Sequence, residues 1–346
     1  MNVLVFQVLA VLVAAGGPVV PENVLLNELV EKGVKMPDGQ VVCLPAPTMA
    51  EGLNEKQQAA VLAAIAPRGK VQEFLDKGSS APVSLKPGKI ASTGKAGDVI
   101  RTINVGFIVY GDWGVLTSDE FSRGILKVGK PGSEKKEGMV SRAGYLKTTD
   151  LMVRGLPTLT KPGMKEYFLY TTFRLFERVE LSTTRFGVAT KTPTGVIVAA
   201  KVDPRFAKDK QYPNQWREIV KDAQGEAQLG PSQPYSGAAF YAKVTRLIKP
   251  ENAIFVEFHH VFYEPRIWFG EDENLMPTQL RRIIPFKVKE FRIKLARATE
   301  EEAEKKLQAE KKPSEEKPSE EKPSEEKPSE EKPSEEKPSE EKPAEK

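Results

Sequence analysis

The sequence predicts an α+β fold: N-terminal helices, a mostly antiparallel curved sheet, and a long C-terminal helix followed by a disordered tail. Three observations support this prediction. Apolar residues recur at helical spacing before residue 80 and again after Met276. Between these regions, β-branched and aromatic runs alternate with polar residues and are separated by Gly and Pro turns. Helices and strands that occupy separate blocks of a chain are typical of the α+β class.

The first block, residues 18–80, is expected to contain three helical segments. The stretch PENVLLNELVEKGV places Leu25 and Leu29 on one helical face and ends at Gly33. In GLNEKQQAAVLAAIAPRG, Asn54 stands where a helix cap is expected, and KVQEFLDKGSSAP provides a third short helix and then a linker. We expect these segments to form a small subdomain or a collar on the main domain.

The main domain is expected over residues 81–298. Strands are predicted for DVIRTINVGFIVY, for two runs in KEYFLYTTFRLFERVELSTTRFGVATKT, and for GVIVAAKVD; SGAAFYAKVTRLIKPENAIFVEFHHVFYEP is predicted to be a hairpin. A short helix is expected after Ser118, and a long one after Met276, interrupted at Pro285 and extended over 299–311. This order resembles helix-grip folds, in which a curved sheet holds a terminal helix over a cavity, and the resemblance implies no particular function.

The last segment, residues 312–346, is expected to be a disordered tail. It consists of six KPSEE repeats and a final KPAEK. Proline removes a backbone donor in every repeat, and a segment with almost no apolar residue cannot offset the entropy cost of ordering. The tail holds eight Lys and thirteen Glu, net −5, and the whole chain carries +4, so residues 1–311 carry +9. This basic body suits polyanions, but its cations are spread along the sequence, which does not favour nucleic acid as a partner.

Residues 1–17, MNVLVFQVLAVLVAAGG, are expected to be a signal peptide. The apolar run has the length of a signal-peptide core and is too short to span a bilayer comfortably. No Lys or Arg precedes it, so a buried strand is the competing interpretation. Cys43 is the only cysteine, which rules out an internal disulfide. We expect a secreted or periplasmic protein without a transmembrane anchor; mass spectrometry of the mature N-terminus in the exported fraction checks this.

Two short motifs in GKIASTGKAGD are rejected. A phosphate-binding P-loop needs four residues between its glycines and Ser or Thr after Lys, whereas five residues separate Gly88 from Gly94 and an alanine follows Lys95. Ser92 and Lys95 have the spacing of a Ser-x-x-Lys nucleophile, but the glycines around them oppose the helix that this motif requires. We expect a flexible loop here.

The most distinctive stretch of the main domain is KVDPRFAKDKQYPNQWREI. It lies between predicted strands, where binding residues often occur. Its aromatic rings could stack on a sugar or another flat ligand, and its two aspartates could act as a carboxylate pair. The competing interpretation is structural, because a long loop needs packing of its own and Trp and Tyr supply it efficiently. The candidate ligand-binding residues from this region are Asp203, Arg205, Asp209, Tyr212, Asn214, Trp216 and Tyr235.

The only two histidines, His259 and His260, are adjacent in a predicted strand and therefore point to opposite faces. His260 shares its face with Phe258 and Phe262 and is expected in the core. His259 shares its face with Glu257, and the two could supply metal ligands, an acid/base pair or an ordinary polar patch. There is no HExxH motif. We therefore predict no metal, cofactor or catalytic residue, and we add Glu257 and His259 to the candidate ligand-binding residues.

Two stretches, VDPRFAKDKQYPNQWREI and YSGAAFYAKVTRL, together resemble a pattern in predicted secreted proteins of planctomycete-type bacteria. The resemblance extends roughly over residues 20–298 and leaves out the tail. It implies export, and it implies no activity, catalytic residue or cofactor.

Three functions are compatible with these residues. The first is an exported, non-enzymatic binding or structural protein, with an envelope polymer as one conceivable partner and the tail as a disordered spacer. The second is a protein that binds a small apolar, lipid-like ligand between its sheet and terminal helix. The third is a hydrolase that uses carboxylates near residues 203–217, or Glu257 with His259. A binding protein is favoured over an enzyme, because no catalytic motif is present.

Overall fold

The computed structural model describes residues 22–118, 120–121, 140–156, 160–161, 163–270, 272 and 274–311. The chain divides into two compact units, Met1–Lys305 and Lys306–Lys346. The expected signal peptide, most of the helix expected after Ser118, and the repeat tail lie outside the described residues. Those expectations therefore stay predictions.

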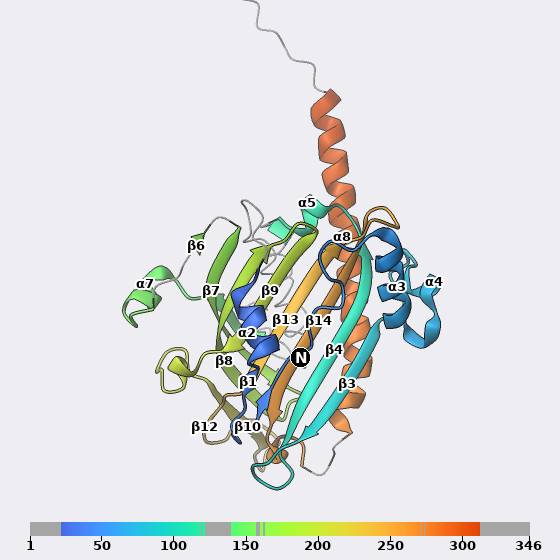
Figure 1. Cartoon of the computed structure of the whole chain (residues 1–346). Helices are drawn as coiled ribbons and strands as arrows, with labels where there is room; N and C mark the ends of the chain where they lie inside the picture. The colour runs from blue at the N-terminus through green and yellow to red at the C-terminus, as the bar shows by residue number, and fades with distance from the viewer. Residues whose placement is uncertain are drawn as a thin grey trace, which may run out of the picture. The chain divides into compact units, whose positions relative to one another are not determined.

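Within the described residues, the first unit is built on a twelve-stranded sheet (Figure 1). All of its strand pairs are antiparallel. The central order is β3, β4, β14, β13, β9, β8, and β8 also pairs with β7 and β10. The strands are β3 (Ser84–Ala91), β4 (Val99–Tyr110), β5 (Val140–Tyr145), β6 (Thr160–Lys161), β7 (Met164–Leu175), β8 (Val179–Lys191), β9 (Gly195–Val202), β10 (Gln215–Lys221), β11 (Ala227–Leu229), β12 (Gln233–Pro234), β13 (Ala238–Arg246) and β14 (Ala253–Glu264).

One face of the sheet, here called the inner face, packs against the long helix α8 (Leu275–Lys311). Large apolar side chains alternate along the central strands and place every second residue on this face. The strand side chains of this core include Ile103, Val105, Phe107, Phe173, Leu181, Phe240, Val256 and Phe258; the helix contributes Met276, Leu280, Ile284, Val288, Phe291 and Leu295. The helix spacing of three and four residues keeps one stripe of α8 on the sheet.

Helix α8 differs from the prediction at Pro285, because it runs through the proline without a break. Pro285 lies on the exposed side of the helix, where water can bond the carbonyl group that a proline leaves without a donor. Arg292 on α8 lies toward the sheet, although arginine side chains are mostly exposed in folded proteins. It is buried, and its guanidinium donates to the backbone oxygens of Ile108 at 2.8 Å and Ala81 at 2.6 Å.

The opposite face, here called the outer face, is covered by the N-terminal helices (Figure 1). Helix α2 (Val24–Glu31) packs Leu25 and Leu29 on the outer face of β8, β9, β13 and β14, and α3 (Glu55–Ile65) and α4 (Val71–Phe74) cover β4 and β14. Asn54 caps α3 as predicted, in a capping box with Gln57. The sheet therefore has helices on both faces.

Short elements connect these layers. They are β1 (Val34–Lys35), β2 (Val41–Val42), η2 (Pro67–Gly69), α5 (Trp113–Leu116), α7 (Thr148–Met152), η3 (Pro204–Phe206) and η4 (Arg266–Trp268). The predicted hairpin is confirmed as β13 and β14, joined at Lys249–Asn252. The expected flexible loop at 88–98 is partly wrong, because β3 continues to Ala91 and pairs with β4. No helix in the described part of the chain is long and apolar enough to cross a membrane.

The α+β prediction is confirmed. A large antiparallel sheet holds the C-terminal helix on one face, which is the helix-grip arrangement that the order of elements indicated.

Candidate functional site

The site begins where the sheet forks. Strand β9 pairs with residues Arg185–Lys191 of β8, whereas β10 pairs with Val179–Ser182 of the same strand. Asn214 holds the fork: its side chain accepts a hydrogen bond from the Thr184 backbone N–H at 2.7 Å and donates to the Asp203 carbonyl at 2.6 Å. Because Asn214 is fully buried and bonded on both sides, the two branches separate at a fixed point.

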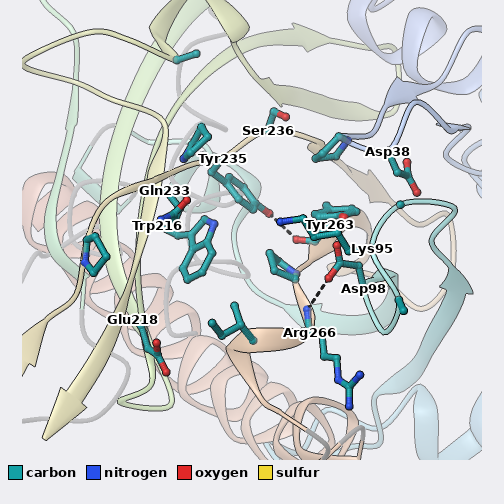
Figure 2. A pocket seen from close by; sticks show the side chains of 18 of the residues that line it. Asp38, Lys95, Asp98, Trp216, Glu218, Gln233, Tyr235, Ser236, Tyr263 and Arg266 are labelled. Atoms are coloured by element: carbon teal, nitrogen blue, oxygen red, sulfur yellow. Dashed lines mark hydrogen bonds between the residues drawn. The ribbon is translucent and has the colours of Figure 1, made fainter.

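A groove of about 1060 Å³ opens beside this fork (Figure 2). One wall comes from β10 and the β12 segment, and the other from the end of β14, η4 and the loop before β4. Apolar and aromatic side chains dominate the lining, and charged groups lie at its rim. The lining residues are Pro37, Asp38, Gly94, Lys95, Ala96, Asp98, Ala207, Trp216, Glu218, Pro231, Gln233, Pro234, Tyr235, Ser236, Tyr263, Pro265, Arg266, Ile267 and Gly270.

Aromatic rings form the inner part of the groove. Tyr235 stacks on Trp268 with ring centroids 5.6 Å apart, and Trp216 meets Trp268 edge to face at 5.9 Å. The Tyr235 hydroxyl donates to the Tyr263 carbonyl oxygen at 3.2 Å. The pairs fix the rings as a rigid apolar surface with few rotatable bonds, which suits a wall that must receive an apolar ligand.

Asp98 ties the two segments of the second wall together. Its carboxylate accepts hydrogen bonds from the Arg266 backbone N–H at 2.9 Å and from the Tyr263 hydroxyl. Burial, and then the bond to Asp98, raises the pKa of Tyr263 to about 12, so the phenol stays protonated and donates. Gly97 permits the close approach, because its φ is +89° and a Cβ there would lie 2.3 Å from the Arg266 side chain.

The charged rim is asymmetric (Figure 2). Asp38, Lys95, Asp98 and Arg266 lie on one side of the groove, and Glu218 lies on the other. The Asp38 carboxylate is already bonded by the Ser92 hydroxyl at 2.6 Å and the Thr93 N–H at 2.9 Å. The groove therefore combines an apolar floor with a polar rim in which most of the charged groups lie on one side, the pattern of a site for an amphiphile.

The structure brings two of the predicted ligand-binding residues, Trp216 and Tyr235, into this groove. Asp203 and Asn214 instead belong to the fork. Asp203 is buried, and its carboxylate caps η3 at the Arg205 N–H and pairs with the guanidinium of Arg205.

The remaining residues of the predicted loop pack on the outer face. Asp209 accepts from Arg154 at 2.6 Å. This bond lowers the pKa of the Asp209 carboxyl to about 2, although partial burial acts to raise it. Tyr212 packs on Tyr170 at 5.3 Å, and Arg205 lies over the ring of Phe168. Asp203 and Asp209 thus pair with different arginines, and the geometry gives no support to a hydrolytic carboxylate pair.

Glu257 and His259 face the outer side of β14, away from the groove. The Glu257 carboxylate accepts from the Thr48 hydroxyl at 2.7 Å and from the Thr48 and Met49 backbone N–H groups. Burial raises the pKa of Glu257, but bonds from His259 and Thr48 outweigh it and leave the pKa below its usual value. His259 Nδ1 bonds Asn104 Oδ1 at 2.7 Å. The pair anchors the N-terminal chain to the sheet.

Sequence reasoning missed most of the second wall. Tyr263 lies at the end of β14, and Arg266 and Ile267 follow that strand. Lys95 lies in the loop that contains the two rejected motifs. One signal was present: two glycines in four residues, Gly94 and Gly97, commonly mark a close backbone approach. What they approach, the chain after β14, is 168 residues away from Asp98 in the sequence.

Apolar side chains of the inner face and of α8 pack against one another. A void of about 20 Å³ lies there, lined by residues of β4, β7, β8, β13 and β14, together with Tyr235, Trp268 and Met276. The apolar ligand expected between the sheet and the terminal helix stays a prediction. The described residues contain no group of three His, Cys, Asp or Glu side chains that could hold a metal ion.

Comparisons with known proteins add a distant likeness. No protein-family model matches the chain, and no curated protein is significantly similar to it. Among solved structures, the crystal structure of human STARD10 is similar over 66% of this chain and 82% of that chain, with 10% sequence identity and a TM-score of 0.28. At this TM-score, nothing about the fold or the site of this chain is inferred from the likeness.

Proposed function

We propose that this protein binds an apolar, lipid-like ligand in the groove beside the fork of the sheet. The observation that carries the proposal is the groove itself. Its volume of about 1060 Å³ is slightly above the roughly 300–1,000 Å³ typical of small-molecule sites. Its floor is aromatic and aliphatic, and its polar groups gather at the rim, so an extended apolar chain with a polar end fits its chemistry.

The position of the groove supports binding rather than catalysis. Two of the three carboxylates that line it are engaged: Asp98 bonds Tyr263 and Arg266, and Asp38 bonds Ser92 and Thr93. A general acid or base must be able to reach the reacting atom, and groups held by two donors are poorly placed for that. Glu257 and His259 are buried under the N-terminal chain and do not line the groove.

A neutral apolar dye tests the proposal. Nile red is titrated into the full-length protein, and its fluorescence reports transfer into an apolar site. Ile267 lies in the groove wall and is 57% exposed, so Ile267→Asp places a charge in the site with little effect on the core. We expect at least about tenfold weaker dye binding, which corresponds to about 1.4 kcal/mol.

Val153 provides the matched control. It is 81% exposed, lies next to α7, and is outside the groove, so Val153→Asp is expected to leave dye binding unchanged. Absence of saturable dye binding by the unaltered protein would contradict the proposal. An equal loss in both variants would assign the binding to nonspecific exposed surface instead.

A further inference from the structure

Helix α8 lies along one face of the sheet and carries two large apolar side chains on the side that faces solvent (Figure 1). Phe286 is 56% exposed, and Ile293 is 50% exposed. Seven residues are close to two helical turns, so both side chains project from the same side of the helix. The opposite side, which includes Ile284 and Phe291, packs on the sheet. A helix that covers a sheet normally turns polar residues to water, which makes this exposed apolar pair unusual.

Basic side chains alternate with these two apolar side chains. Residues that follow one another by three or four positions line up along one side of a helix. Five exposed residues of α8 are spaced in this way, and we call them the exposed stripe: Arg282, Phe286, Lys289, Ile293 and Arg297. The exposed stripe contains no acidic residue, so each apolar side chain has a cation before it and a cation after it.

The helix around the exposed stripe has an excess of positive charge. Residues 275–299 hold seven basic side chains and one acidic side chain, a net charge of +6. The acidic residue, Glu290, pairs with Lys287 beside the stripe. Arg297 pairs with Glu301 at 2.8 Å, but both side chains are more than half exposed, and such pairs are weak and screened by salt. The other two cations of the stripe take part in no ion pair among the described residues.

A partner for the exposed stripe must be anionic and must also receive apolar side chains. The surface of a bilayer that contains anionic lipids offers both, because its head groups attract Lys and Arg and its boundary with the acyl chains receives large apolar side chains. The aliphatic parts of Arg282 and Lys289 can lie along that boundary while their charges stay among the head groups. A nucleic acid would pair with the charges but would leave Phe286 and Ile293 in water.

We propose that the exposed stripe of α8 is a docking surface for an anionic lipid bilayer. The helix lies parallel to the bilayer surface, Phe286 and Ile293 enter the head-group region, and the three cations of the stripe bind lipid phosphates. The opposite side of α8 stays packed on the sheet, so docking requires no unfolding. Two apolar side chains bury a limited area, so the attachment is reversible and sensitive to salt.

The docking surface is near the candidate groove along the chain. Element η4, which carries Ile267 of the groove wall, and α8 are consecutive elements. A bilayer bound at α8 would supply the apolar ligand that we propose for the groove. Docking itself does not require an occupied groove, so this inference and the proposed function can be tested separately.

The test measures binding of the full-length protein to lipid vesicles by flotation at increasing lipid concentration. One set of vesicles is pure phosphatidylcholine, and the other contains about 30% phosphatidylglycerol, which makes the surface anionic. At low salt we expect at least about tenfold tighter binding to the anionic vesicles, because several cations near such a surface act together. At about 0.5 M salt we expect this difference to disappear, because exposed charges are screened.

Variants of exposed residues test the stripe itself. Arg282→Glu combined with Lys289→Glu is expected to weaken binding to the anionic vesicles by at least about tenfold. The matched control is Lys208→Glu combined with Lys210→Glu, which changes the net charge equally at two exposed lysines after η3 and is expected to change binding by less than about twofold. Phe286→Ala removes an apolar side chain and is expected to weaken binding by about three- to tenfold.

Equal binding of the unaltered protein to the two kinds of vesicle, or no binding to either, overturns the inference; this comparison does not depend on whether any variant folds. Equal weakening by the two charge-reversing variants assigns the attraction to overall charge and also contradicts a specific stripe. Full binding by Phe286→Ala shows that apolar contact is not used, and it replaces the bilayer with a soluble polyanion as the partner. Nile red binding measured without vesicles reports on the groove alone, so failure of the proposed function would leave the vesicle result unchanged.

Discussion

At the scale of single residues, His260 packs as an aromatic core residue, but its two buried ring nitrogens reduce the stability of the fold. Its ring stacks between Phe258 and Phe262, with centroid distances of 6.0 and 5.0 Å, as an aromatic core residue would. Its nitrogens, however, are buried without partners among the described residues. A buried polar residue that leaves its hydrogen-bonding groups unpaired lowers stability, and such residues are expected at functional sites.

The variant His260→Phe tests this conflict. We expect it to stabilise the protein by about 1–2 kcal/mol, because it removes two unpaired buried nitrogens and keeps the aromatic packing. The gain should grow as the pH falls below 6.5. The folded state keeps His260 neutral while the unfolded chain takes up a proton, so the unaltered protein loses stability in that range. Urea unfolding at pH 7.5 and pH 5.5 measures both effects.

The neighbouring histidine is the control. His259→Phe has the same change in side chain, but it removes the bond to Asn104 and a contact with Glu257, so a loss of roughly 1–3 kcal/mol is expected. Destabilisation by His260→Phe of similar size would show that His260 holds a structural water instead.

At the scale of elements, α8 holds the inner face through one stripe of side chains. Phe291 is 1% exposed and packs edge to face on Phe107 at 6.3 Å, whereas Phe286 on the same helix is 56% exposed. Phe291→Ala is expected to cost about 3–5 kcal/mol through lost burial and a cavity, and Phe286→Ala less than about 0.5 kcal/mol. Urea unfolding midpoints give both values, and similar costs for the two variants would contradict this account of the helix.

The elements that sequence analysis predicted correctly have strong local signals. Asn54 before an Ala-rich run gives α3, and two β-branched runs around Lys249–Asn252 give the hairpin of β13 and β14. The break at Pro285 was wrong because the cost of a proline depends on whether its side of the helix faces water, and periodicity does not show that. Element type was therefore more predictable than continuity.

The candidate site was less predictable than the fold. Trp216 and Tyr235 could be selected because large aromatic residues in a loop are distinctive, and both line the groove. Tyr263, Arg266 and Ile267 gave no signal, because the loop that they meet at Asp98 is far away in the sequence. Burial of a charged residue was not predictable either: Arg185 in β8 is buried because both faces of the sheet are covered. Whether such a residue is buried depends on tertiary packing, not on local sequence.

At the scale of the whole molecule, we predict that the repeat tail contributes little to the stability of the first unit. Deletion of residues 312–346 is expected to change the melting temperature by less than about 1 °C, because a repeat with almost no apolar residue has little to bury against the first unit. Differential scanning calorimetry measures this, with Nile red binding as a second readout. A fall of more than about 4 °C, equivalent to at least 1 kcal/mol, would show that the tail packs on the folded unit.

The position of α8 also determines the order in which this protein can complete its fold. Arg292 on α8 bonds the carbonyl of Ile108 on β4, 184 residues earlier in the chain. During synthesis, every strand of the sheet therefore emerges before the helix that covers its apolar inner face. Until residues 275–298 arrive, that face is open to other chains, so nascent or C-terminally truncated molecules are the ones that need a chaperone to prevent aggregation.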